Sequence, residues 1–218
     1  MSEGLFDAIG GLPLQRQALA DGVCLLHGHA CEVSSSLLEG VRAIAQQSPF
    51  RQMATPGGLR MSVAMTNCGE AGWSSGPDGY RYTALDALVG RAWPAMPVDW
   101  RRFASQMAEE AGFAGFSPDV CLINRYAPGA KLSMHQDKDE ANLLAPIVSV
   151  SLGVPAVFVL GGLKRRDPVQ RLSLMHGDVL VLGGPSRLRH HAVLPLKPGH
   201  HPATGELRIN LTFRQALR

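Results

Sequence analysis

Residues 120–214 carry seven short β-rich runs: VCLINRY (120–126), PIVSVSL (146–152), AVFVL (156–160), RLSLM (171–175), DVLVL (178–182), HHAVLPL (190–196) and ELRINLTFR (206–214). Gly, Pro, Asp and Lys turns separate the runs. No helical pattern lies between one run and the next, which excludes a βαβ sheet because parallel strands need crossover helices. The runs therefore predict an antiparallel sandwich or jelly roll.

Two helices are predicted upstream of these strands. Ser34 to Ser36 form a hydroxyl-rich N-cap before LLEGVRAIAQQ, and Pro49 closes that segment. A second helix starts near Asp99 and stops at Gly112. Its apolar residues recur at three- and four-residue intervals: Trp100, Phe103, Ala104, Met107 and Ala111. Residues 54–80 between the helices are interpreted as hairpins and loops. The fold class is thus α+β, mainly β, with N-terminal helices packed on the strands.

The composition indicates one ordinary globular domain, because 45% of the 218 residues are hydrophobic and 18% are charged. The formal net charge of +3 is compatible with a phosphate-bearing partner. Two interpretations of the basic residues stay open, a phosphate-facing surface or solvated loop charges. These residues are Lys164, Arg165, Arg166, Arg171, Arg187 and Arg189.

The four cysteines form no CxxC pair, so neither a zinc site nor a disulfide framework is indicated. Reduced thiols predict a cytoplasmic protein. The first residues, MSEGLFDAIGG, show no basic patch followed by an apolar run, and we expect no signal peptide. No apolar stretch approaches the length that spans a bilayer, so we expect no membrane partner.

The tripeptide His135-Gln136-Asp137 is a candidate metal motif. On a strand, residues two apart point to the same side, so the imidazole and the carboxylate would converge. Two histidines and one carboxylate suit non-haem Fe(II). The second histidine must come from another strand, which His190 and His191 open. Alternation lets only one of them face inward, and the residues alone leave the choice open. We interpret His176 as structural.

The run RINLTFR (208–214) alternates strictly between polar and apolar residues. On a strand, Ile209, Leu211 and Phe213 would face the core. Two guanidiniums, Arg208 and Arg214, would then share the opposite face with Asn210 and Thr212. They could grip the two carboxylates of a diacid such as 2-oxoglutarate. The alternative is an ordinary solvent-facing strand. Asn124 and Tyr126 form a further same-face pair that could complete a polar pocket.

Six segments together closely resemble the AlkB family of nucleic-acid dealkylating dioxygenases. They are TPGGLRMSVAMTNCGEAGW (55–73), WPAMP (93–97), CLINRYAPGAKLSMHQDKDE (121–140), APIVSVSLG (145–153), HGDVLVLGGPSRLRHH (176–191) and RINLTFRQA (208–216). The resemblance covers most of the chain from about residue 50. It implies a double-stranded β-helix, the jelly roll predicted above.

The resemblance also implies the cofactors and their ligands. His135, Asp137 and His191 would ligate Fe(II), which selects His191 over His190. Arg208 and Arg214 would bind 2-oxoglutarate, helped by Asn124, Tyr126 and Asn210. O2 and 2-oxoglutarate would be consumed, with release of aldehyde, succinate and CO2. The implied layout places an N-terminal extension and helix in 1–50, nucleotide-recognition hairpins in 51–100 and the dioxygenase core in 120–218.

The implied substrate is an N-alkylated base, such as 1-methyladenine or 3-methylcytosine, in single- or double-stranded DNA, with RNA as a second class. Trp73 would stack on the base, with His135 on its other side. Tyr80 would touch the nucleic-acid backbone and Asp139 the exocyclic amine. Arg165 and Met61 complete the substrate-binding set. Such bases are cationic, which an aromatic platform and a carboxylate both favour. We expect a monomer.

Two positions depart from the family pattern. Leu59 stands where an aromatic residue is expected in the base-recognition loop, and His190 precedes His191. One alternative function is a 2-oxoglutarate oxygenase that acts on a protein side chain or a small molecule. Another is a non-catalytic jelly-roll binding module. The base-facing residues Trp73, Tyr80 and Asp139 distinguish nucleic-acid repair from the first alternative. Formation of succinate with Fe(II) distinguishes an enzyme from the second.

Overall fold

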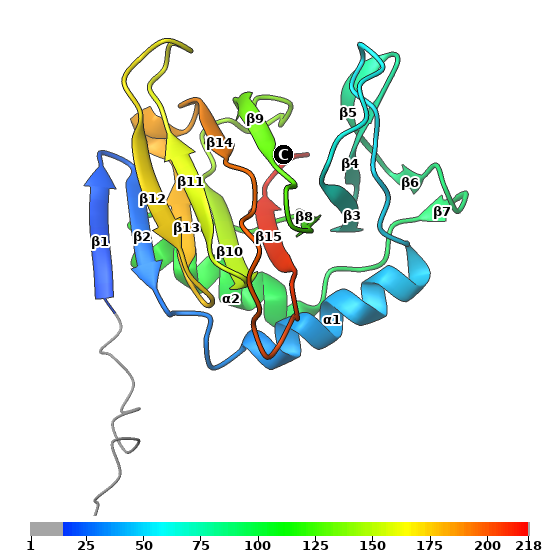
Figure 1. Cartoon of the computed structure of the whole chain (residues 1–218), viewed down its shortest axis with the longest axis horizontal. Coiled ribbons are helices and arrows are strands. Elements are labelled where there is room, and N and C mark those ends of the chain that lie inside the picture. Colours follow the sequence, from blue (N-terminus) through cyan, green and yellow to red (C-terminus); the bar gives the residue numbers. More distant parts are fainter. Residues whose placement is uncertain (1–14, 218) are drawn as a thin grey trace, which may run out of the picture.

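A computed structural model describes residues 15–217 (Figure 1). The larger of its two main sheets has seven strands in the order β1-β2-β13-β10-β15-β8-β3. Their bounds are Gln15–Ala20 for β1, Val23–His27 for β2, Ala64–Gly69 for β3, Val120–Tyr126 for β8, Ile147–Gly153 for β10, Val179–Leu182 for β13 and Arg208–Arg214 for β15. Every pairing in this sheet is antiparallel.

The smaller sheet has the order β12-β11-β14-β9 and is also antiparallel. Its strands are β9 (Leu132–His135), β11 (Ala156–Leu160), β12 (Gln170–Leu174) and β14 (His191–Val193). Figure 1 shows β11, β12 and β14 in front of β10 and β13. The two sheets enclose one apolar cluster that includes Leu122, Phe158, Leu160 and Leu180. The predicted mainly-β jelly roll is confirmed.

Two hairpins and two helices complete the fold. The hairpins are β4 (Gly72–Gly76) with β5 (Gly79–Thr83), and β6 (Leu85–Asp86) with β7 (Arg91–Ala92). The helices are α1 (Ser34–Gln47) and α2 (Val98–Glu110), followed much later by one 3-10 turn, Gly184–Ser186. Both helices pack on the outer face of the larger sheet through a second apolar cluster (Figure 1).

The strand β15 lies in the middle of the larger sheet and is buried along its whole length. Ile209, Leu211 and Phe213 face the helices, where the Phe213 ring meets Trp100 edge-on. Arg208 and Arg214 are therefore on the inner face, between the sheets. The solvent-facing alternative for this strand is wrong, because the smaller sheet covers the polar side.

The start of α1 differs from the prediction. No side chain caps the helix, whose N-cap residue is Val33. Ser34 and Ser36 lie inside the first turn and donate their hydroxyls backwards, to the carbonyls of Cys31 (2.8 Å) and Val33 (2.9 Å). A serine hydroxyl near the start of a helix can cap the helix N–H groups or donate to a preceding carbonyl, as here. The sequence therefore locates the helix but not its cap. The second helix begins one residue before Asp99, and Gly112 follows it with φ +97°.

The region before residue 120 contributes more to the sheets than the sequence indicates. β1 and β2 extend one end of the larger sheet, and β3 forms its opposite edge. The predicted core from residue 120 onward is therefore incomplete. The expected absence of a signal peptide, and the first part of the expected N-terminal extension, fall on residues 1–14 and lie outside the described residues.

All four cysteines are free thiols, as predicted, and three of them are buried. Between residues 15 and 217, no helix has the length and apolar character needed to cross a membrane.

Leu211→Ala tests the contact between β15 and the helices. Leu211 is fully buried, so we expect the free energy of unfolding to fall by about 2–5 kcal/mol. Leu144→Ala is the matched control, because Leu144 is 91% exposed and should change stability by less than about 0.5 kcal/mol. Urea unfolding followed by circular dichroism measures both variants. Equal effects would contradict the placement of β15 against the helices.

Candidate active site

Strands β9 and β14 bring two histidines together. His135 and His191 are direct cross-strand partners, with ring centroids 4.4 Å apart. Asp137 lies between them, with Oδ1 3.6 Å from His135 Nε2 and Oδ2 3.8 Å from His191 Nε2. All three ligand atoms lie within 4.8 Å of one another. The trio is thus compact enough to hold one metal ion.

Asp137 is placed differently from the sequence prediction. β9 ends at His135, so the alternation of a single strand does not align the two ligands. Instead, Arg214 donates from Nη2 to Asp137 Oδ2 at 2.7 Å, and Arg187 donates from Nη1 to the Asp137 carbonyl at 2.7 Å. Buried Arg214 therefore orients the carboxylate, and buried Arg187 holds the irregular backbone of Asp137.

The tautomers of both histidines suit metal binding. His135 Nδ1 lies 2.7 Å from the Ser133 carbonyl, and His191 Nδ1 lies 3.1 Å from the Arg189 carbonyl. A carbonyl only accepts hydrogen bonds, so each Nδ1 carries the proton and each Nε2 presents a lone pair. Two such nitrogens and one carboxylate would leave neighbouring coordination positions of a metal ion open, an arrangement that suits Fe(II).

The charges of these groups support the same conclusion. Burial lowers the pKa of His191 to about 4, so its imidazole is neutral near pH 7 and able to ligate. Burial alone would raise the pKa of Asp137, but Arg214, His191 and His135 outweigh it and hold that pKa well below its usual range. The His135 side chain remains 37% exposed, so the trio is open to solvent on one side.

A cluster of buried polar side chains lies on β15 and β8, which are neighbours in the larger sheet. Their register places Arg208 opposite Tyr126 and Asn210 opposite Asn124, as same-face pairing predicts. The Arg208 guanidinium lies 4.9 Å from the centre of the Tyr126 ring and donates to Ser151 Oγ at 3.0 Å. Within residues 15–217, several buried polar atoms here have no hydrogen-bond partner: Asn124 Oδ1, Tyr126 OH, Arg208 Nε and Nη1, and Arg214 Nε and Nη1.

These orphaned atoms fit a dicarboxylate. Arg208 is 2% exposed and makes no ion pair with any residue from 15 to 217. An uncompensated buried charge costs several kcal/mol, so its free N–H groups require an anion. Arg214 already contacts Asp137 and has a second free nitrogen beside the metal trio. A diacid could thus place one carboxylate on Arg208 and the other near Arg214, as 2-oxoglutarate would.

Asn210, predicted to help bind 2-oxoglutarate, makes four hydrogen bonds to neighbouring residues. Its Nδ2 donates to Ser149 Oγ (2.8 Å) and to the Val150 carbonyl (3.0 Å). Its Oδ1 accepts hydrogen bonds from Asn124 and Thr212. Asn210 therefore orients Asn124, whose Oδ1 remains free. Sequence reasoning missed Ser149, although VSVS in β10 places it on one face with Ser151 and could have indicated both.

The base-facing residues gather on the β4–β5 hairpin. Trp73 and Tyr80 stack with ring centroids 5.4 Å apart and an interplanar angle of 14°. Trp73 Nε1 donates to Asp139 Oδ2 at 2.9 Å. Tyr80 thus covers one face of the indole, and Asp139 contacts its edge. The structure thus brings Trp73, Tyr80 and Asp139 together. Asp139 is two residues after Asp137 in the sequence, which places this group near the metal trio.

Arg165 and Met61 lie on other elements. Arg165 donates from Nη1 to the Met134 carbonyl at 2.8 Å, next to His135. Met61 packs against the apolar cluster between the sheets.

The basic residues do not form one surface. Lys164, Arg165, Arg166 and Arg171 are exposed. Arg187 is 3% exposed and pairs with Glu140 at 3.1 Å, so a phosphate-facing role for it is wrong. Arg189 is half-buried and donates to the Gly161 carbonyl. Nothing in the sequence distinguishes a buried arginine from an exposed one when its carboxylate partner lies 47 residues away.

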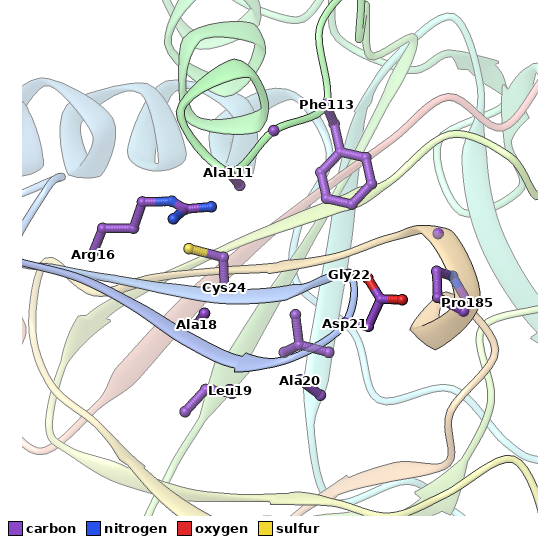
Figure 2. Close-up of a pocket in the computed structure, with 13 residues that line it drawn as sticks. Arg16, Ala18, Leu19, Ala20, Asp21, Gly22, Cys24, Ala111, Phe113 and Pro185 are labelled. Carbon is purple, nitrogen blue, oxygen red and sulfur yellow. The ribbon is translucent and has the colours of Figure 1, made fainter.

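A separate hollow of about 610 Å³ includes none of the metal trio, Arg208 or Arg214 in its lining. The β1–β2 hairpin, the end of α2 and the turn at Gly184 and Pro185 enclose it. Figure 2 shows Arg16, Cys24 and Phe113 around this hollow. Burial raises the pKa of the Cys24 thiol against the opposing effect of Arg16, so the thiol stays protonated. The hollow contains no group of metal-ligating side chains, and we do not assign the active site to it.

The jelly roll, the trio that could hold a metal ion and the buried arginines beside polar side chains are typical of 2-oxoglutarate- and Fe(II)-dependent oxygenases. The family model described as the 2OG-Fe(II) oxygenase superfamily matches residues 22–214. The alpha-ketoglutarate-dependent dioxygenase AlkB of Salmonella typhimurium is 59% identical over 201 residues, which cover 92% of this chain and 93% of that protein. The chain belongs to the AlkB family of these dioxygenases.

Two further comparisons extend the family relationship. The solved structure of OsALKBH1 has a TM-score of 0.81 and 27% sequence identity, and the match covers 92% of this chain and all of that one. The nucleic acid dioxygenase ALKBH1 of Mus musculus is 37% identical over 106 residues, which cover 49% of this chain and 27% of that protein.

His191→Ala and His190→Ala test the metal centre as a matched pair. Loss of His191 removes one of three ligands, so we expect the affinity for Mn(II) or Co(II) to fall by about 100-fold or more. His190 Nδ1 faces the Gly162 carbonyl instead, and its loss should leave metal affinity within about twofold. Anaerobic calorimetric titration measures both. A larger loss in His190→Ala would contradict the assignment.

Proposed function

We propose that the chain repairs N-alkylated nucleic-acid bases by oxidative dealkylation, with Fe(II), O2 and 2-oxoglutarate. Two observations carry this proposal: the compact His135, Asp137 and His191 trio, and the buried Arg208 guanidinium, which has no carboxylate partner among residues 15–217. That combination requires an anionic cosubstrate next to a metal. Family membership supports 2-oxoglutarate as this cosubstrate.

When bound, iron with O2 and 2-oxoglutarate supplies an oxidant strong enough to hydroxylate an N-alkyl carbon, and 2-oxoglutarate becomes succinate and CO2. The hydroxyalkyl group then leaves the base as an aldehyde. His135, Asp137 and His191 would hold the metal. Arg208 and Tyr126 would bind the carboxylate far from the metal, because Arg214 is the arginine that contacts Asp137.

The substrate side rests on the aromatic hairpin and its acidic neighbour. Trp73 stacks on Tyr80 and packs against the apolar cluster between the sheets, and its indole would hold a flat base at this place. Asp139 adds a negative charge at the indole edge. Both features favour a cationic base over a neutral one, which suits 1-methyladenine and 3-methylcytosine. Arg165 and Met61 would border the same site, near His135 and the sheet interior.

The base must leave its stack before its alkyl group can reach a metal held between two sheets. Alkylation at N1 of adenine or N3 of cytosine blocks Watson–Crick pairing, which lowers the cost of extrusion. DNA, single- or double-stranded, is the proposed substrate, with RNA as a second class; the mouse relative is named only as a nucleic acid dioxygenase. We propose a monomer that acts in the cytoplasm.

The test is an assay with an oligonucleotide that carries 1-methyladenine. The oligonucleotide should lose the mass of one methylene group and release formaldehyde, only when Fe(II) and 2-oxoglutarate are present. His135→Ala removes a metal ligand and should abolish both changes. If succinate forms while the methyl group stays, the oxygenase assignment survives and the nucleic-acid assignment fails.

Trp73 variants in the same assay separate the substrate from the oxidation chemistry. Loss of a stacking platform costs roughly 1–3 kcal/mol per base, so Trp73→Ala should slow repair by about tenfold or more. Trp73→Phe retains a ring and should retain most repair. Neither should reduce the slow 2-oxoglutarate turnover without oligonucleotide, and equal repair by the alanine variant would contradict base stacking.

A further inference from the structure

Glu140 is a buried carboxylate that joins three elements of the fold. Its side chain is 2% exposed. Oε1 accepts a hydrogen bond from the Tyr82 hydroxyl at 2.8 Å and lies 3.0 Å from Arg214 Nε. Oε2 accepts from Arg187 Nη2 at 3.1 Å. A carboxylate so removed from water depends on these donors for its stability.

The two arginines connect Glu140 to the metal trio. Arg214 contacts Glu140 through Nε and Asp137 through Nη2 at 2.7 Å, so one guanidinium is shared by two carboxylates. Arg187 donates to the carbonyls of Asp137 (2.7 Å) and Ala145 (3.0 Å). One guanidinium therefore holds both ends of the irregular segment that follows β9. Arg187 and Arg214 balance the charges of Asp137 and Glu140. Because the four groups share their contacts, the position of each depends on the others.

Tyr82 connects this cluster to the recognition hairpin. It belongs to β5, and its cross-strand partner in β4 is Trp73. Trp73 in turn donates to Asp139, the residue before Glu140. Two cross-strand aromatic residues are thus bound to two consecutive acidic residues. The hairpin cannot shift against the segment that contains Asp137 without breaking one of these hydrogen bonds.

We propose that Tyr82 is a positioning residue that couples the placement of a nucleic-acid base on the β4–β5 hairpin to the orientation of Arg214 and Asp137, through Glu140. This inference rests on the proposed function, because it assumes that the hairpin binds the base. The coupling needs no movement of the sheets. A base seated against Trp73 fixes the hairpin, the Tyr82 hydroxyl fixes Glu140, and Glu140 restrains the guanidinium that contacts both Asp137 and the cosubstrate pocket.

Tyr82→Phe removes the hydroxyl and retains the ring, so it tests the coupling with little change in packing. The measured quantity is the stimulation of 2-oxoglutarate turnover by a 1-methyladenine oligonucleotide. We expect this stimulation to fall on the order of tenfold, as kcat rather than KM, because a hydrogen bond to a buried charge is lost. Turnover without oligonucleotide is measured in the same variant, and an equal fall there would indicate a structural role for Tyr82 and overturn the coupling.

Thr83→Val is the matched control on the same strand. It also removes a hydrogen-bonded hydroxyl, which donates to the Leu85 carbonyl at 2.9 Å and does not contact Glu140. Stimulation should be retained in this variant. Equal stimulation in Tyr82→Phe and in the unmodified protein would overturn the coupling. If the unmodified protein is not stimulated by any alkylated oligonucleotide, the coupling and the proposed function both fail.

A second readout does not depend on nucleic acid. In protein loaded with Co(II) and 2-oxoglutarate, the visible spectrum reports the geometry of the metal ligands. Glu140→Gln retains the volume of the side chain and removes its charge, so Arg214 and Asp137 should reorient and the Co(II) absorption should shift. An unchanged spectrum in a folded Glu140→Gln variant would overturn the link from Glu140 to Asp137, even where nucleic-acid repair is intact.

Discussion

The ion pair between Arg214 and Asp137 is the contact on which the site depends. Arg214 belongs to β15, in the middle of the larger sheet, whereas Asp137 follows β9 at the edge of the smaller one. The pair therefore joins the two sheets at the point where they enclose the cluster of buried polar side chains. It holds the pKa of Asp137 well below its usual range despite burial, so the carboxylate is ionised and available to a cation.

Strand β15 also supplies Arg208, the candidate cosubstrate-binding arginine, and both faces of this strand are buried. Its apolar residues pack on α1 and α2, which fixes the strand against the outer layer. Its polar residues are consequently forced inward, where only an ionic or hydrogen-bonding partner makes them stable. Arg214 forms ion pairs with Asp137 and Glu140, whereas Arg208 forms none with the residues that the structure describes. That difference between two otherwise similar arginines is what indicates a place for an anionic cosubstrate.

The sequence predicts those parts of the structure that depend on local periodicity. The alternation in RINLTFR correctly separates the helix-facing residues from Arg208 and Arg214, and the same-face pair Tyr126 and Asn124 lies opposite Arg208 and Asn210. Long-range pairing is beyond such reasoning. Alternation cannot choose between His190 and His191; the family resemblance selects His191, and the structure pairs His191 with His135. β1, with the sequence QRQALA, has no alternating apolar pattern and was detectable only through its pairing with β2. The hydrogen bonds that Glu140 accepts from Tyr82 and Arg187 join residues 58 and 47 positions apart in the sequence. No local sequence pattern indicates such contacts.

Binding of 2-oxoglutarate to the anaerobic, Mn(II)-loaded protein tests the central claim most directly. Calorimetry should compare 2-oxoglutarate with 2-oxobutyrate, which lacks the carboxylate proposed to contact Arg208. We expect 2-oxobutyrate to bind at least about tenfold more weakly to the unmodified protein, because a charge-assisted contact is missing. Arg208→Met should bind both compounds with similar, weak affinity. If Arg208→Met still distinguished them as strongly, or if 2-oxoglutarate bound equally well without metal, the account of the site would be contradicted.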